Sequence, residues 1–284
     1  MPDVTIFEMG PRDGLQNEAA QIATADKVHL VDMLTDAGFT KIEVASFVSP
    51  KWVPQMADGA DVLAAIQRAP GVAYTALTPN LKGFERAVAA KVDEIAIFGS
   101  ASEGFSHSNL GRGRRAALDM FAPVADAAKA QDIKMRGYVS CVVECPFDGP
   151  TAPGDVAEAT EAMLAMGCYE VSLGDTIGKG TPETIAAMLD AVLGVAAPDQ
   201  LAGHYHDTNN RALESIAVSL DKGLTVFDAA VGGLGGCPYA PGAKGNVATE
   251  AVVEMLAARG LETGIDRARL ASAAAFAKSL RNMT

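Results

Sequence analysis

The sequence predicts an α/β fold, a single-domain (β/α)8 TIM barrel that takes in residues 1–284. Short runs of apolar, β-branched residues alternate with longer amphipathic stretches along the whole chain, and eight such pairs can be counted. Strands that alternate with helices predict a parallel sheet. Eight units in 284 residues favour closure into a barrel, because this is the usual length of that architecture. An open, doubly wound sheet is the alternative that the pattern leaves.

The expected strands are recognised by their length and by their β-branched and aromatic residues. In chain order they are Thr5–Met9, Lys41–Phe47, Ala73–Leu77, Glu94–Phe98, Met135–Ser140, Tyr169–Leu173, Leu201–His206 and Val226–Val231. Between the first two, Ala25–Ala37 has its apolar residues on one helical face and ends before Gly38, a residue that commonly terminates helices. Thr181, Pro182 and Glu183 are typical of a helix start: a cap, a proline in the first turn and an acid near the positive end of the dipole.

The composition is that of a globular protein, with 49% hydrophobic and 20% charged residues. The formal net charge of −12 argues against nucleic-acid binding, because phosphate backbones require a basic surface. No apolar stretch approaches the roughly 20 residues that span a bilayer, so no membrane partner is expected. Four scattered cysteines and an N-terminus without a secretory signal predict a cytoplasmic protein.

Polar residues gather at the ends of several expected strands, where barrels of this kind carry their function. The first strand runs into Gly10–Glu18 (GPRDGLQNE), and the second carries Glu43. The sixth leads to Asp175, and the seventh ends in His204-Tyr205-His206-Asp207. The predicted site therefore lies at the carboxyl ends of these strands.

Two of the four histidines, His204 and His206, stand two positions apart on one expected strand. Side chains at this spacing point to the same side, so both imidazoles can face one metal ion. Asp13 is available as a third ligand if the barrel closes its first strand beside its last. Nitrogen and carboxylate ligands suit Mg2+ or Mn2+, with Zn2+ left open. The alternative is a buried polar pair with satisfied hydrogen bonds.

Three further residues are candidates for chemistry. Arg12 could form a salt bridge at the barrel mouth, but its Gly-flanked loop suits it to hold a carboxylate or a developing enolate. Asp175 is either functional or a cap of its own loop. Cys237 lies between glycines and a proline, in a segment that could move over the site.

These segments together resemble the 3-hydroxy-3-methylglutaryl-CoA lyase family, in the superfamily of barrel metallolyases and Claisen-type synthases. The matching segments are Gly10–Glu18, Ile42–Asp58 (IEVASFVSPKWVPQMAD), Arg136–Cys141 (RGYVSC), Ser172–Pro182 (SLGDTIGKGTP), His204–Thr208 (HYHDT) and Gly232–Glu250 (GGLGGCPYAPGAKGNVATE). They extend over nearly the whole chain, and the second and the last are long and specific.

The resemblance implies a role for each matching residue. The implied ligands of a divalent metal, Mg2+ or Mn2+, are Asp13, His204, His206 and Asn246. The implied catalytic residues are Arg12 for the enolate, Glu43 as an anchor, Asp175 for proton transfer, and Cys237. The implied substrate contacts are Arg12, Gln16 and Arg136.

The resemblance also implies the reaction, the cleavage of 3-hydroxy-3-methylglutaryl-CoA to acetyl-CoA and acetoacetate in leucine catabolism and ketone-body formation, by a homodimer that binds an acyl-CoA. Such a cleavage needs a polarised hydroxyl, an acid/base group and a cation for the enolate, and the residues above supply these. The sequence departs from the family at Ala19, where lysine is usual, and at Asn209-Asn210, where an aromatic residue and glycine are usual.

Other functions remain open from the sequence. A related 3-hydroxyacyl-CoA lyase or a Claisen-type acyl-CoA synthase would use the same barrel. Metal hydrolases of the amidohydrolase type also carry a His-x-His pair, but theirs normally lies early in the chain and is joined by further histidine ligands, which the four histidines present here do not readily supply. A non-catalytic metal- or CoA-binding protein would not need Arg12, Glu43, Asp175 and Cys237 together.

Overall fold

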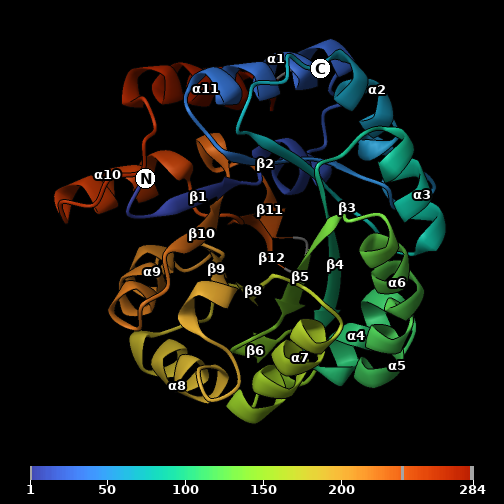
Figure 1. Ribbon diagram of the computed structural model, residues 1–284. Helices are drawn as coiled ribbons and strands as arrows, with labels where there is room; N and C mark the ends of the chain where they lie inside the picture. Colours follow the sequence, from blue (N-terminus) through green and yellow to red (C-terminus); the bar gives the residue numbers. More distant parts are fainter. Residues whose placement is uncertain (1, 238–239, 282–284) are drawn as a thin grey trace.

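Eight parallel strands form a closed barrel in the computed structural model, which describes residues 2–237 and 240–281 and, of these, the side chains of all but 237 and 240–244. The fold class predicted from the sequence is confirmed (Figure 1). The strands are β1 (Thr5–Glu8), β2 (Lys41–Ser46), β3 (Ala73–Leu77), β4 (Glu94–Ser100), β5 (Lys134–Ser140), β8 (Glu170–Asp175), β9 (Leu201–Tyr205) and β10 (Val226–Ala229). The barrel closes between β1 and β10, where Thr5 is paired with Val226.

Every predicted strand is found, with several ends shifted by one or two residues, and two of these shifts lie at the barrel mouth near the histidine pair and the last strand. His206 lies one residue beyond β9, where it pairs with Asn246 in an isolated antiparallel bridge. Val231 lies beyond β10 and begins a short 3-10 turn, η4 (Val231–Gly233). At both places the chain leaves the sheet at the barrel mouth earlier than predicted. His206 then pairs with Asn246, and Val231 turns into η4, instead of continuing a strand.

Helices surround the barrel on its outside (Figure 1). They are α1 (Thr24–Asp36), α2 (Gly59–Ala65), α3 (Leu81–Ala89), α4 (Glu103–Leu110), α5 (Arg114–Asp119), α6 (Ala122–Ala130), α7 (Pro153–Ala165), α8 (Pro182–Val192), α9 (Ala212–Asp221), α10 (Thr249–Ala258) and α11 (Arg267–Leu280). In α1, Leu30, Val31 and Leu34 are fully buried, as the predicted apolar face requires. The Thr181 hydroxyl accepts from Thr184 N, so the predicted start of α8 is confirmed.

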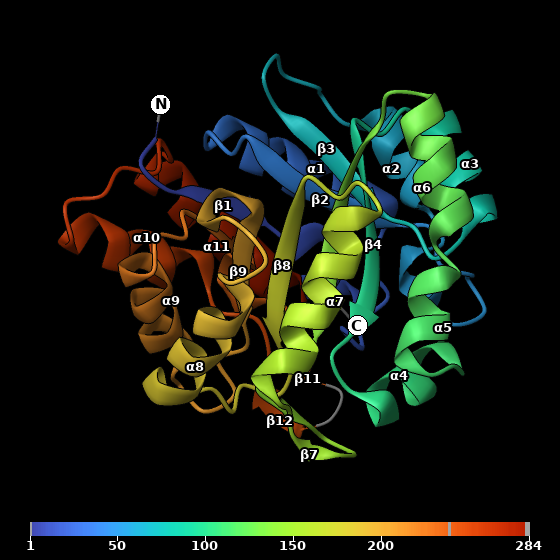
Figure 2. The same cartoon turned by 60° about the horizontal axis from the view of Figure 1, so that its bottom comes forward.

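Two short hairpins lie at the carboxyl ends of the barrel strands. One joins β6 (Glu144–Cys145) and β7 (Gly149–Pro150), and the other joins β11 (Gly236–Cys237) and β12 (Ala240–Lys244). Figure 2 shows β7, β11 and β12 together at this end. Within residues 2–237 and 240–281, no helix combines the length and apolar character needed to cross a bilayer.

Candidate metal centre and active site

A tight turn after β1 carries Arg12 and Asp13 into the barrel mouth. Residues Gly10–Gly14 form a single π-helical turn, η1, a geometry that is frequent at functional sites. The turn needs its glycines, since a Cβ on Gly10 would lie 2.6 Å from Glu8 Oε1 and one on Gly14 would lie 2.7 Å from Leu234 Cβ. The packing of η1 against neighbouring atoms therefore fixes where Arg12 and Asp13 point.

Glu8 ties this turn to the other end of the chain. Its Oε1 accepts from Gly10 N at 2.7 Å and from Val231 N at 2.9 Å, and its Oε2 accepts from Thr249 Oγ1 at 2.7 Å. The side chain is fully buried, and this burial raises its pKa to about 7. Sequence analysis did not single out Glu8, although an acid within the apolar run Thr5–Met9 was a visible signal.

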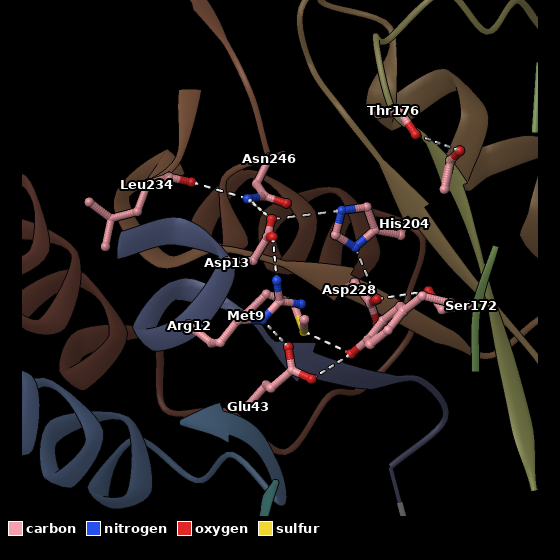
Figure 3. A network of polar contacts seen from close by, with 12 residues as sticks. Met9, Arg12, Asp13, Glu43, Ser172, Thr176, His204, Asp228, Leu234 and Asn246 are labelled. Atoms are coloured by element: carbon pink, nitrogen blue, oxygen red, sulfur yellow. Dashed lines mark hydrogen bonds and ion pairs between the residues drawn. The ribbon is translucent and has the colours of Figure 1, made fainter. Parts of the chain in front are cut away.

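The structure brings Asp13, His204 and His206 together. One ligand atom from each of the three lies within 4.8 Å of the other two. The His204 and His206 rings are 5.4 Å apart, and His204 Nε2 is 4.0 Å from Asp13 Oδ2. Asn246 Nδ2 donates to the same Asp13 oxygen at 2.8 Å, so the four predicted ligands are neighbours, as Figure 3 shows for Asp13, His204 and Asn246.

This group of side chains fits a divalent cation. Within the described part of the chain, His206 Nδ1 is buried and has no hydrogen-bond partner, which is costly unless a ligand occupies it. Burial and the neighbouring His204 lower the pKa of His206 to about 4, so this imidazole is neutral and can donate a lone pair. Burial opposes ionisation of Asp13, but Arg12 and His204 outweigh it and lower the pKa of that carboxyl to about 2.

Arg12 is held by two carboxylates, one from its own turn and one from β2. Its Nε donates to Glu43 Oε2, and its Nη1 donates to Asp13 Oδ1 at 2.6 Å (Figure 3). Glu43 is fully buried on β2 and also accepts from the Tyr138 hydroxyl at 3.1 Å. The guanidinium is thereby fixed beside the metal-ligand group, with its carbon 5.8 Å from the centre of the Tyr138 ring.

A cavity of about 960 Å3 opens over these groups. Its lining includes the polar residues Arg12, Asp13, His204 and His206 together with apolar side chains. The apolar lining includes Val48, Trp52, Leu77, Phe98, Phe105 and Met120. Gln16 also lines it, and its Oε1 is buried without a partner in the described structure, so this amide is available to a bound molecule. The volume is that of a site for a sizeable ligand.

Arg136, a predicted substrate contact, lies outside the cavity lining. It is the third residue of β5 and is 1% exposed. Its guanidinium donates to Glu170 and to Asp228, at 2.6 Å and 2.7 Å for the shortest contacts. A side chain so far before the end of a strand lies beneath the barrel mouth, and the predicted substrate contact stays a prediction.

Asp175 caps the loop that follows β8. Its Oδ1 accepts from Lys179 N at 3.1 Å and its Oδ2 from Gly180 N at 2.7 Å. The residue is 2% exposed and is not part of the cavity lining, and burial raises its pKa. The loop-cap alternative thus describes its present contacts, and the predicted part in proton transfer stays a prediction.

Two other positions named from the sequence, Cys237 and Asn209, lie in segments at the barrel mouth. Cys237 belongs to β11, and its side chain lies outside the described residues. Asn209, one of the unusual residues after the histidine pair, donates its Nδ2 to Gly178 O at 2.6 Å. This departure from the family therefore links the loop after β9 to the loop after β8.

Sequence and structure comparisons point to one family. Residues 3–277 match the HMGL-like family model. The mitochondrial hydroxymethylglutaryl-CoA lyase of Bos taurus is 53% identical over 273 residues, which is 96% of this chain and 84% of the relative. The 3-hydroxy-3-isohexenylglutaryl-CoA/hydroxymethylglutaryl-CoA lyase of Pseudomonas aeruginosa is 52% identical over 95% of this chain and 90% of the relative. The crystal structure of the HMG-CoA lyase from Brucella melitensis superimposes with a TM-score of 0.98, at 59% identity, over 99% of this chain and all of the other.

Proposed function

The chain belongs to the HMGL-like family, and from that premise we propose that it is a lyase that cleaves 3-hydroxy-3-methylglutaryl-CoA into acetyl-CoA and acetoacetate. The observation that carries the proposal is the convergence of Asp13, His204 and His206 beside a fixed arginine at the floor of a large cavity. The lyase names of the bovine, Pseudomonas and Brucella relatives favour cleavage over a Claisen-type synthesis.

The cation of the proposed site is Mg2+ or Mn2+, held by Asp13, His204, His206 and Asn246. If the Asn246 carboxamide presents its Oδ1, the set has two oxygen and two imidazole nitrogen ligands, and a mixed set of carboxylate, amide and imidazole suits these ions. When bound, the metal would lower the pKa of the substrate's C3 hydroxyl and hold it in place.

Arg12 is the proposed partner of the enolate. Cleavage of the C2–C3 bond leaves the electron pair on the thioester fragment, whose oxygen becomes negatively charged. A guanidinium already fixed by Asp13 and Glu43 meets this charge without further reorganisation. Gln16, with its unpartnered Oε1 on the cavity wall, is the proposed polar contact for the acyl group.

Cys237 and Asp175 are the proposed proton-transfer residues. A thiol on the β11–β12 hairpin could protonate the enolate carbon to give acetyl-CoA. Asp175 is buried and lies outside the cavity lining, so its role requires the loop after β8 to move. Asp175→Asn tests this role, since an amide in place of the carboxylate cannot accept a proton, and unchanged turnover would leave Asp175 as a loop cap.

The test of the function is direct. The purified protein, incubated with 3-hydroxy-3-methylglutaryl-CoA and Mg2+ or Mn2+, should form acetoacetate and acetyl-CoA in equal amounts. Chelation should abolish the reaction, and readdition of either ion should restore it. Full activity after exhaustive demetallation would refute the metal centre, and the absence of acetoacetate with either ion would refute the substrate.

The proposal also covers the domain organisation, the oligomeric state and the pathway. We take residues 1–284 as one catalytic domain that acts in leucine breakdown. We expect it to be a homodimer, and light scattering in solution measures the oligomeric state. A cytoplasmic location is our expectation from the scattered cysteines, whereas the bovine relative is named as mitochondrial. Fractionation of the source cells distinguishes the two.

A further inference from the structure

Behind the candidate metal centre, His204 is hydrogen-bonded to a carboxylate that the proposed mechanism does not use. Its Nδ1 lies 3.0 Å from Oδ2 of Asp228, in the middle of the neighbouring strand β10 (Figure 3). The Asp228 side chain has no exposed surface. The other ring nitrogen of His204, Nε2, faces Asp13 at 4.0 Å.

Asp228 is itself held as a hydrogen-bond acceptor. Arg136 Nη2 donates to Oδ1 at 2.7 Å, Arg136 Nη1 donates to Oδ2 at 3.1 Å, and the Ser172 hydroxyl donates to Oδ2 at 2.8 Å. These donors converge on a fully buried carboxylate that forms an ion pair with the Arg136 guanidinium, so the contacts are those of an ionised acid. An ionised carboxylate can only accept hydrogen bonds.

We infer that Asp228 is a positioning residue, which fixes the tautomer and the ring orientation of His204 so that Nε2 presents its lone pair to the metal. Because Asp228 can only accept, Nδ1 of a neutral His204 must carry the proton, and the lone pair is then on Nε2. The inference rests on the metal centre of the proposed function, and it adds Asp228, with Arg136 beneath it, to the residues on which metal affinity depends.

The competing explanation is purely structural: Asp228 could serve only to neutralise the buried Arg136. Glu170 offers a matched control, because it accepts from Nε of the same guanidinium at 2.6 Å and is nearly as buried. Glu170→Gln and Asp228→Asn each remove one negative charge from Arg136. Only the second change alters the partner of His204.

The Asp228→Asn substitution should reverse the tautomer. A guanidinium can only donate, so the introduced amide keeps one of the two Arg136 contacts. The contact of Nη2 with Oδ1, at 2.7 Å, is shorter than that of Nη1 with Oδ2, at 3.1 Å, so the amide oxygen is expected in place of Oδ1 and the NH2 group in place of Oδ2. Ser172 can adapt to an amide donor, because a hydroxyl can accept as well as donate. The amide would then donate to His204 Nδ1, and the ring proton would move to Nε2, where it blocks the metal.

The experiment has two readouts that do not depend on turnover. Nitrogen-15 NMR of the metal-free protein, recorded at a pH high enough that the spectrum shows a neutral His204 ring, identifies the protonated nitrogen. Titration calorimetry with MgCl2 and MnCl2 measures the metal affinity. We expect Nδ1–H in the wild type and in Glu170→Gln, and Nε2–H in Asp228→Asn with metal affinity lower by about 10- to 100-fold.

Each outcome decides the inference. It is overturned by Nε2–H in the wild-type protein, by Asp228→Asn that keeps wild-type metal affinity, or by Glu170→Gln that loses as much affinity as Asp228→Asn. The wild-type spectrum decides alone if Asp228→Asn does not fold. A wild-type protein that binds neither ion would refute the proposed metal centre, whereas ion binding with the Nε2–H tautomer would refute this inference only.

Discussion

At the scale of single residues, Arg12 has the most constrained position in the site. It is 6% exposed, it lies in the η1 turn, and it contacts carboxylates from the turn itself and from β2. Its positive charge is secure, because Glu43 and Asp13 outweigh the effect of burial and raise its pKa. The geometry, and not the charge alone, therefore distinguishes it from a lysine.

Arg12→Lys is predicted to lower kcat by about 10²-fold with little change in KM. An ammonium keeps the charge but cannot contact Glu43 and Asp13 at once in the planar arrangement that meets the enolate. Steady-state kinetics with 3-hydroxy-3-methylglutaryl-CoA measure both constants. Arg269→Lys, on the exposed side of α11, is the control and should leave both unchanged. A rise in KM alone would make Arg12 a ground-state anchor.

Cys237 gives a second prediction at this scale. Cys237→Ser should lose most of kcat and keep metal affinity, because a hydroxyl is a far weaker acid than a thiol. Alkylation should inactivate the wild type, and substrate analogue plus metal should slow it. The other three thiols are internal controls: they are buried, and burial raises the pKa of Cys141 and Cys168 to about 12. Wild-type turnover by the serine variant would reduce the hairpin to a lid.

At the scale of elements, the sequence predicts the scaffold well and the interior of the barrel poorly. Strand periodicity locates every barrel strand, and the spacing of His204 and His206 correctly puts them on one side. Asp228 and Tyr138 both lie within expected strands. The residues next to Asp228 in the sequence do not show whether this acid orients a histidine or neutralises an arginine. Only tertiary contacts across β5, β8, β9 and β10 separate these roles, and the sequence does not show that Arg136 pairs with Glu170 and Asp228.

Glu8 joins β1, η4 and α10 through its hydrogen bonds. Its raised pKa predicts how the free energy of unfolding depends on pH. Its pKa is raised from 4.5 to about 7, so the folded state binds more protons than the unfolded state between these values. Protonated Glu8 therefore contributes to the free energy of unfolding. The contribution is complete below pH 4.5 and is lost as the pH rises to about 7. The loss is about 3 kcal/mol, since each pKa unit corresponds to about 1.4 kcal/mol.

Glu8→Gln should remove this part of the pH dependence, because glutamine resembles the protonated acid and can still accept from Gly10 N and Val231 N. Urea unfolding at intervals between pH 4.5 and 7 measures the slope. Glu254→Gln, on the exposed face of α10, should retain the wild-type slope. Parallel curves for wild type and Glu8→Gln would show that Glu8 titrates normally.

At the scale of the whole molecule, the proposed metal ligands come from both ends of the chain. Asp13 follows the first strand, His204 lies in the seventh barrel strand in sequence and His206 just beyond it, and Asn246 lies beyond the last. A bound cation would therefore link segments that unfold together, and its binding energy adds to the stability of the entire barrel.

Metal binding should thus raise the melting temperature. At a concentration 100-fold above Kd the stabilisation is about 2.7 kcal/mol, which corresponds to roughly 5 °C or more for a domain of this size. His206→Ala should abolish the increment, because it removes a ligand. His29→Ala, on the exposed side of α1, should keep it. An increment that persists in His206→Ala would mean that the ion binds elsewhere.

The pairing of β1 with β10 also determines when the enzyme can first exist during its own synthesis. Asp13 and Asn246 are 233 positions apart. During synthesis, Asp13 therefore emerges from the ribosome long before Asn246. Until Val226–Ala229 emerges, β1 and β9 both have an open edge that another unfinished chain could pair with. Closure of the barrel and completion of the ligand set are therefore late, coincident events, and chains interrupted before β10 are both inactive and prone to aggregate.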